Sequence, residues 1–182
     1  RCADVTGVQT CALPISLAIN APTLCYDGKG IGAIKLYQII FEMRLYDIDI
    51  MRISETRWRG IGSFYVQYDT RTVYKVLYFG SHRDPSAGVA IILSPKAQLL
   101  YESHFAHFPT YPGRLLSVSL TNTDIFMMNA PQTAGERQIF LVHLRDVFQA
   151  REGDLFLMGD FNEDGTARSE EHTSELQSRP HI

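Results

Sequence analysis

Short β-rich runs fill the middle of the chain, and a segment of helical periodicity lies on either side of them. The runs, which are bounded by turn residues as strands usually are, occupy residues 48–53, 73–79, 88–93, 116–120, 125–128 and 155–158. Apolar residues recur at helical spacing over residues 32–46 and 136–150. This order predicts an α/β protein. Spacing alone leaves two arrangements open, a large mixed sheet or two sheets packed as a sandwich.

The two ends of the chain are related to each other in a way that protein chemistry does not explain. Residues 5–16 read VTGVQTCALPIS and residues 168–178 read RSEEHTSELQS. DNA that encodes the first segment is nearly the reverse complement of DNA that encodes the second, and it resembles a common sequencing adapter. We therefore expect residues 1–16 and 168–182 to be adapter-derived. Residues 17–167 would then be a partial domain of a longer natural protein.

The composition of residues 17–167 limits what this part of the chain can be. It holds 14 Lys and Arg against 16 Asp and Glu, a net charge of −2. Its length suits one domain with a sizeable core, and no apolar run approaches the ~20 residues of a membrane span. Tight nucleic-acid binders are usually basic, although metal ions and a local basic patch can offset phosphate charge. With only Cys25 left in this part, no disulfide framework is possible.

Two acidic residues follow apolar runs at equivalent places. Glu55 follows IDIMRIS and Asp160 follows LFLMG. Functional side chains often gather just beyond strand ends, because a rigid strand aims them at a crevice. If the two strands are neighbours, two carboxylates converge, which is costly unless a cation lies between them. Mg²⁺ would suit such a site because it prefers oxygen ligands. Both acids could equally be solvated turn residues.

Several short motifs add to this pattern, in order along the chain. They are AINAPTL at residues 18–24 followed by GK, YDIDI at 46–50, SETRW at 54–58, GVAIILS at 88–94, RLL at 114–116 and GDFN at 159–162. Together they resemble the endonuclease/exonuclease/phosphatase superfamily. Within that superfamily they are most similar to the endonuclease domains of non-LTR retrotransposons, which are LINE-type and related to apurinic/apyrimidinic endonucleases.

The resemblance implies a fold and a role for four residues. The fold would be a two-sheet β-sandwich flanked by helices, DNase I-like and truncated at its C-terminal side. Glu55 resembles the principal metal ligand, and Asn20 the asparagine that supports metal and phosphate. Asp160 resembles the acid that orients or deprotonates the attacking water, and Asn162 the amide that holds the phosphate or the same water. The implied reaction is hydrolysis of a DNA phosphodiester with Mg²⁺ or Mn²⁺.

The sequence also departs from the family pattern. Where the family has a phosphate-contacting tyrosine, this chain has Asn129, in NAPQ, which is either a catalytic amide or an ordinary loop residue. Ile19 replaces the opening tryptophan, and Ser54 replaces the usual Gln or Cys. The late Ser-Asp-His motif of the family does not occur in the sequence. The chain is therefore expected to lack full activity.

Other interpretations stay open at this point. The chain could be a decayed copy that no longer catalyses, or a phosphatase or lipid phosphodiesterase of the same superfamily, although SETRW and GVAIILS favour the retrotransposon branch. Trp58, with Arg57 and Arg59, could contact DNA or anchor a surface loop. His104 and His107 are expected in a surface-packed loop. No membrane association and no obligate protein partner is implied, and the compartment stays open beyond a nuclear site for a retrotransposon protein.

Overall fold

The computed structural model describes residues 16–20, 31–82, 84, 87–107, 112–121, 123–151 and 153–162. The segments predicted to be adapter-derived lie outside these residues, apart from Ser16. That prediction therefore stays a prediction.

The described residues form two β-sheets and three helices. The five-stranded sheet has the order β1-β2-β5-β4-β3, and the four-stranded sheet has the order β6-β7-β8-β9. The strands are β1 (Ser16–Asn20), β2 (Ile50–Ser54), β3 (Gly60–Gln67), β4 (Val73–Gly80), β5 (Val89–Leu93), β6 (Tyr101–His107), β7 (Leu115–Leu120), β8 (Thr123–Asn129) and β9 (Asp154–Asp160). The helices are α1 (Ile31–Leu45), α2 (Pro95–Gln98) and α3 (Ala134–Gln149).

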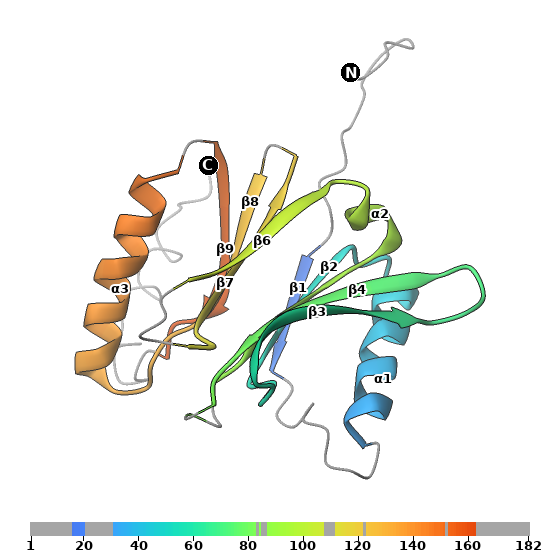
Figure 1. The fold of residues 1–182 in the computed structure, drawn as a ribbon, viewed down its shortest axis with the longest axis horizontal. Helices are drawn as coiled ribbons and strands as arrows, with labels where there is room; N and C mark the ends of the chain where they lie inside the picture. The colour runs from blue at the N-terminus through green and yellow to red at the C-terminus, as the bar shows by residue number, and fades with distance from the viewer. Residues whose placement is uncertain are drawn as a thin grey trace, which may run out of the picture.

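The sheets pack face to face, and a long helix covers the outer face of each (Figure 1). Three buried clusters follow from this layering. One joins α1 to the first sheet, a second lies between the sheets, and a third joins α3 to the second sheet. Ile40, Leu77 and Phe140 are fully buried representatives of the three clusters. The two-sheet sandwich with flanking helices predicted from the sequence is confirmed.

Three of the strands, β1, β3 and β6, are not predicted by the sequence pattern. In β3 the inward positions alternate with outward ones, but two of the inward positions are Gly60 and Gly62. A Cβ atom at Gly62 would lie 2.7 Å from the hydroxyl oxygen of Tyr78 on the neighbouring strand β4. The ring of Tyr78 therefore fills the space that a side chain at position 62 would take. The apolar alternation that marks a strand is thereby hidden. The prediction that His104 and His107 lie in a loop was wrong, because both belong to β6.

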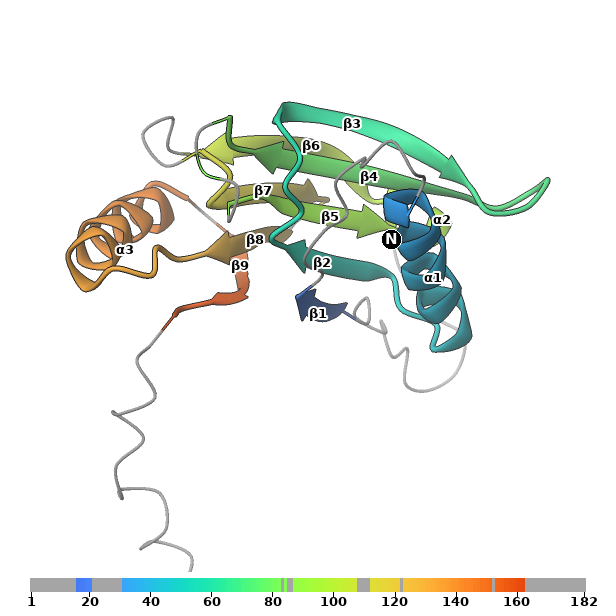
Figure 2. The same cartoon turned by 90° about the horizontal axis from the view of Figure 1, so that it is seen from below.

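Each sheet contains one β-α-β unit with parallel strands. In the first sheet β1 pairs with β2 across α1, and in the second β8 pairs with β9 across α3. The strands β1 and β9 run downward in Figure 1, and their parallel partners share this direction, so all four end at the lower side of the sandwich. Figure 2 views the molecule from this side. None of the described helices is long and apolar enough to cross a membrane.

Candidate active site

The predicted site residues stand at the ends of the four parallel-paired strands. Asn20 is the last residue of β1 and is the Cα partner of Ser54, the last residue of β2. Glu55 follows directly. In the other sheet, Asn129 ends β8 and Asp160 ends β9, and these two are Cα partners. The structure thus brings the residues together in two pairs, one in each sheet.

The last side chains of β8 and β9 point into the space between the two sheets. Met127 on β8 and Met158 on β9 belong to or pack against the cluster between the sheets. Because successive side chains of a strand point to opposite faces, Asn129 and Asp160, two residues further on, face the same interior. Ile50 on β2 is also in that cluster, so Arg52 faces inward from the opposite sheet. The apolar interior therefore ends in a polar layer at this side of the sandwich.

Hydrogen bonds around Asn162 order the second half of the site. The backbone N–H of Asn162 donates to Oδ1 of Asp160 over 2.9 Å, which orients the carboxylate. The side-chain Nδ2 of Asn162 donates to Oδ1 of Asn129 over 3.3 Å and to the carbonyl oxygen of Ala130. Asn162 has a φ of 50°, a left-handed conformation that asparagine tolerates better than most residues. This explains why an asparagine suits the fourth position of GDFN.

The first half of the site is a strained loop after β2. Glu55 is partly buried and has a φ of 56°, and Arg57 has a φ of 59°. Left-handed conformations at non-glycine residues cost of order 1–3 kcal/mol and persist where the surroundings enforce them. Buried Thr56 lies between the two, and its backbone N–H donates to the carbonyl oxygen of Gly88 over 3.3 Å. A Cβ atom at Gly88 would lie 2.6 Å from Oγ1 of Thr56, so this close approach requires glycine.

A chain of backbone hydrogen bonds connects the two halves along the rim of the sandwich. From the Glu55 loop it passes to Gly88, whose N–H donates to the carbonyl oxygen of Gly113 over 3.0 Å. The next residue, Arg114, offers its carbonyl oxygen to the N–H of Asn129 over 2.9 Å. Ala130 then donates to the carbonyl oxygen of Asp160 over 2.8 Å. The loop that carries Glu55 and the strand end that carries Asp160 therefore belong to one connected rim.

Arg52 is the unexpected member of this region. It is 4% exposed, and its Nη2 donates to the carbonyl oxygen of Met128 on β8 over 2.6 Å. Among the residues that the structure describes, its Nε is the one buried side-chain nitrogen or oxygen without a hydrogen-bond partner. Burial lowers the pKa of the Arg52 guanidinium, and the negative charge of Asp160 acts in the opposite direction. The only sequence signal for this residue is a charge inside the apolar run IDIMRIS.

The glycine of GDFN has a packing reason. Gly159 is the Cα partner of Met128. A Cβ atom at Gly159 would lie 2.7 Å from the carbonyl oxygen of Met128 and closer still to its Cγ. The same carbonyl oxygen accepts the hydrogen bond from Arg52. A side chain at position 159 would thus disturb the strand end that carries Asn129.

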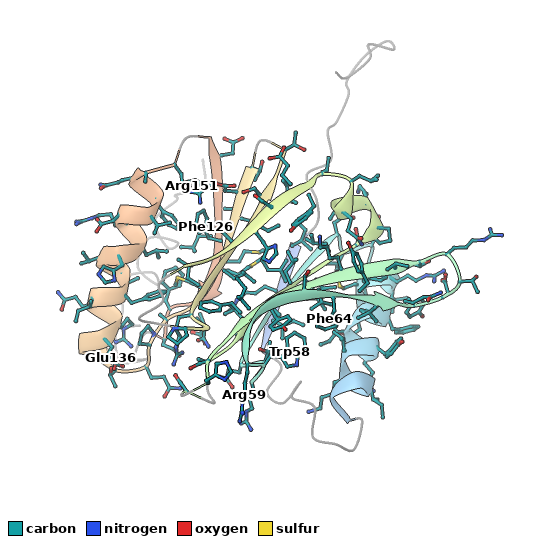
Figure 3. The ribbon with its side chains drawn as sticks, viewed as in Figure 1. Trp58, Arg59, Phe64, Phe126, Glu136 and Arg151 are labelled. Carbon is teal, nitrogen blue, oxygen red and sulfur yellow. The ribbon has the colours of Figure 1, made fainter. Side chains whose placement is uncertain are left out.

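The segment after Glu55 combines an aromatic anchor with an exposed cation. Trp58 packs edge-on against Phe64 and Tyr78, at centroid distances of 5.5 and 5.4 Å. Arg59 is exposed and projects from the lower side of the sandwich, beyond Trp58 (Figure 3). The structure therefore makes Trp58 an anchor of this segment and leaves Arg59 exposed to solvent.

Comparison with solved structures identifies the fold. The sequence matches no protein-family model and no curated protein sequence. A cytolethal distending toxin structure from Haemophilus ducreyi matches with a TM-score of 0.52 at 13% identity, covering 82% of this chain and 68% of that one. CdtB, the biologically active subunit of cytolethal distending toxin, matches with a TM-score of 0.50 at 13% identity, covering 66% of this chain and 57% of that one. An AP endonuclease from Archaeoglobus fulgidus matches with a TM-score of 0.49 at 15% identity, over 82% and 58%.

At these identities the likeness shows the fold and nothing finer. The match spans little more than half of the CdtB chain, 57% of its length. The sandwich of two mainly antiparallel sheets with outer helices is therefore a DNase I-like fold, in the part of it that this chain covers.

Proposed function

We propose that this chain is part of a metal-dependent phosphodiesterase, and specifically of a DNA endonuclease of the non-LTR retrotransposon type. The observation that carries the proposal is the polar rim. Glu55 stands on one side of it, Asp160 with Asn129 and Asn162 on the other, and backbone hydrogen bonds run between them. The retrotransposon assignment rests on the SETRW and GVAIILS motifs.

The residues present fit Mg²⁺ or Mn²⁺. The described residues contain no group of three or more His, Cys, Asp and Glu side chains that could enclose a metal. A Mg²⁺ ion does not need such a group, because it is usually held by one or two carboxylates and keeps several waters. Glu55 would be the carboxylate ligand, and Asn20, at the end of the adjacent strand, would support it. When bound, the ion would supply positive charge to the phosphoryl and leaving oxygens.

Asp160 would act on the attacking water. Its Oδ1 accepts the N–H of Asn162, which fixes the plane of the carboxylate and leaves Oδ2 to accept a proton from water. A carboxylate in this role must be ionised. A water held by Asp160 would face the phosphorus from the side of the second sheet.

Asn162 and Asn129 would orient the water and bind the phosphate, respectively. The Nδ2 of Asn162 is engaged by Asn129 and the Ala130 carbonyl, so the Oδ1 of Asn162 is the atom that would orient the water. Asn129 accepts from Asn162 through its Oδ1, which leaves its Nδ2 as a donor. That donor would bind a phosphate oxygen, as the phenol of the family's tyrosine does. The replacement of tyrosine by Asn129 would then keep a donor at this position.

The proposal is tested by nicking of supercoiled plasmid DNA. The assay compares this chain with a longer clone of the same gene that includes the Ser-Asp-His motif, each in Mg²⁺, Mn²⁺ and EDTA. We expect metal-dependent nicking by the longer clone, weak nicking by this chain, and loss of both in Asp160→Asn. A phosphomonoester and a phosphoinositide serve as alternative substrates. Preference for either would point to the phosphatase or lipid phosphodiesterase branch, and metal binding without any hydrolysis would indicate a decayed copy.

A further inference from the structure

The position of Arg52 places a charged group where the interior of the sandwich changes from apolar to polar. Two residues before it, Ile50 belongs to the apolar cluster between the sheets. At Arg52 the same inner face carries a guanidinium that is 4% exposed. Across the sandwich, its partner is the carbonyl oxygen of Met128, the residue immediately before Asn129.

Stability alone does not account for an arginine at this point. A guanidinium carries five N–H donors, and a buried donor without a partner is destabilising. The Nε of Arg52 is such a donor. Buried charged groups are often no better for stability than well-packed apolar side chains in their place, so the burial of a charge is weak evidence that it is there for stability. A buried charge that its hydrogen bonds satisfy only in part marks a place where something other than stability has set the choice.

The hydrogen bond from Arg52 to Met128 crosses between the two halves of the proposed site. Its donor lies on β2, three residues before Glu55, and its acceptor lies on β8, one residue before Asn129. Met128 is also the Cα partner of Gly159, which precedes Asp160. The rim hydrogen bonds join the halves through loops, whereas this bond joins them directly through the interior.

We propose that Arg52 is a positioning residue. Its hydrogen bond to the Met128 carbonyl oxygen sets the separation between β2, which leads to Glu55, and the strands β8 and β9, which end at Asn129 and Asp160. The inference rests on the proposed function, since it assumes that Glu55 binds a divalent cation. Catalytic geometry must hold to within about 0.5 Å, and one short charged hydrogen bond between two sheets provides such a constraint.

The test uses the 182-residue chain, ¹⁵N-labelled, with Mn²⁺ as the probe. A paramagnetic ion bound at Glu55 broadens nearby resonances with the inverse sixth power of distance, so the side-chain amide signals of Asn129 and Asn162 measure the separation. The variants are Arg52→Met, Arg52→Lys and Glu55→Gln. Ile50→Val, on the same face of β2, is the control for a simple loss of packing. Thermal unfolding is measured for each without metal.

For wild type we expect strong broadening of both amide signals, and for Glu55→Gln little. At equal Mn²⁺ occupancy, the paramagnetic relaxation rates in Arg52→Met should fall to about half of the wild-type values or below. Arg52→Lys, which keeps a charged donor, should recover part of the broadening. Ile50→Val should lower the unfolding temperature and keep the broadening of wild type.

The outcomes separate the two proposals. Wild-type broadening that is identical in Arg52→Met and Arg52→Lys overturns the positioning role and leaves the metal site standing. Broadening that is absent from wild type, or unaffected by Glu55→Gln, overturns the metal site and the positioning role with it. If Arg52→Met fails to fold, wild-type broadening in a folded Arg52→Lys still counts against the inference, and reduced broadening supports it.

Discussion

The side-chain amide of Asn162 donates a hydrogen bond to Oδ1 of Asn129 and so joins the loop after β9 to the end of β8. The sequence predicts both as site residues on separate grounds, Asn162 from GDFN and Asn129 from its place in the Asn-Ala-Pro loop. Their contact makes the second half of the candidate site one hydrogen-bonded unit with Asp160. A substitution at any one of these three residues should therefore disturb the other two.

Glu55→Gln should abolish metal-dependent nicking without unfolding the protein. The substitution keeps the shape of the side chain and removes the charge that would hold the cation. Nicking by the longer clone in Mg²⁺ should fall by about 100-fold or more, a typical scale for removing one charge-stabilising group. Without metal the unfolding temperature should be unchanged or slightly higher. Glu42→Gln, an exposed position on α1, is the matched control, and unchanged nicking in Glu55→Gln at saturating Mg²⁺ would exclude Glu55 from the site.

Arg59→Ala should weaken DNA binding because it removes a cation that is placed to bind phosphate. Arg59 is exposed on the side of the sandwich where the site lies. Binding of a short duplex is measured by fluorescence anisotropy at several salt concentrations. Removal of one cation from the phosphate backbone should reduce the slope of log K against log salt by about 1. Arg71→Ala makes the same charge change at an exposed turn between β3 and β4. Equal slopes for the two variants would mean that Arg59 contributes only net charge.

Gly159→Ala should destabilise the fold because the added methyl group meets Met128. The new Cβ atom would lie 2.7 Å from the Met128 carbonyl oxygen, and overpacking of this kind typically costs about 1–3 kcal/mol. Gly135→Ala is the control, since nothing lies within 4 Å of a Cβ atom there and Gly135 is in α3. That variant should gain up to about 1 kcal/mol from helix propensity. Urea denaturation measures both, and equal stability of the two variants would contradict the packing account.

Asp69 should make the turn between β3 and β4 sensitive to acid. The backbone N–H of Arg71, followed by the side chain of Arg44, lowers the pKa of Asp69 to about 2. A carboxyl whose folded pKa lies below its unfolded value of 3.8 stabilises the fold above that value and loses this contribution as pH falls toward 2. Asp69→Asn should therefore lower the unfolding temperature at neutral pH, with a difference from wild type that disappears between about pH 4 and 2. A difference that is constant over this range would show that the charge of Asp69 is not responsible.

Removal of residues 1–15 and 168–182 should leave the unfolding temperature of the chain unchanged within about 1 °C. We expect both segments to derive from an adapter, and segments of that origin would not have been selected to pack. Calorimetry of the shortened and complete chains measures the effect. A loss of several degrees would show that either segment contributes to the core and would remove the reason for setting these residues aside.

Sequence patterns can predict the strands that have apolar side chains at their inward positions. All residues of β5 and of β2 are buried, so both appear as continuous β-rich runs in the sequence. β3 is hidden because Gly60 and Gly62 stand at inward positions, where the ring of Tyr78 supplies the bulk at Gly62. The identity of a residue does not reveal that a partner strand will fill the space beside it.

The sequence likewise predicts some features of the candidate site and not others. The places of Glu55 and Asp160 follow from one rule, an acid at the end of an apolar strand, and the rule needs no knowledge of tertiary contacts. The contact between Asn162 and Asn129 depends on the register of β8 with β9, which local sequence does not encode. Arg52 can be recognised as unusual within IDIMRIS, but its target on β8 cannot, because the packing of one sheet on the other decides it.

The two β-α-β units place half of the candidate site in each sheet, and this has a consequence for folding. Each unit can form from its own stretch of chain, but neither brings Glu55 and Asp160 together. Joining the two halves requires contacts between β2 and β8, which lie far apart in the sequence. Such contacts form slowly because the intervening chain must first be closed into a loop. Affinity for a divalent cation would therefore report the docking of the two sheets and would appear later in refolding than secondary structure.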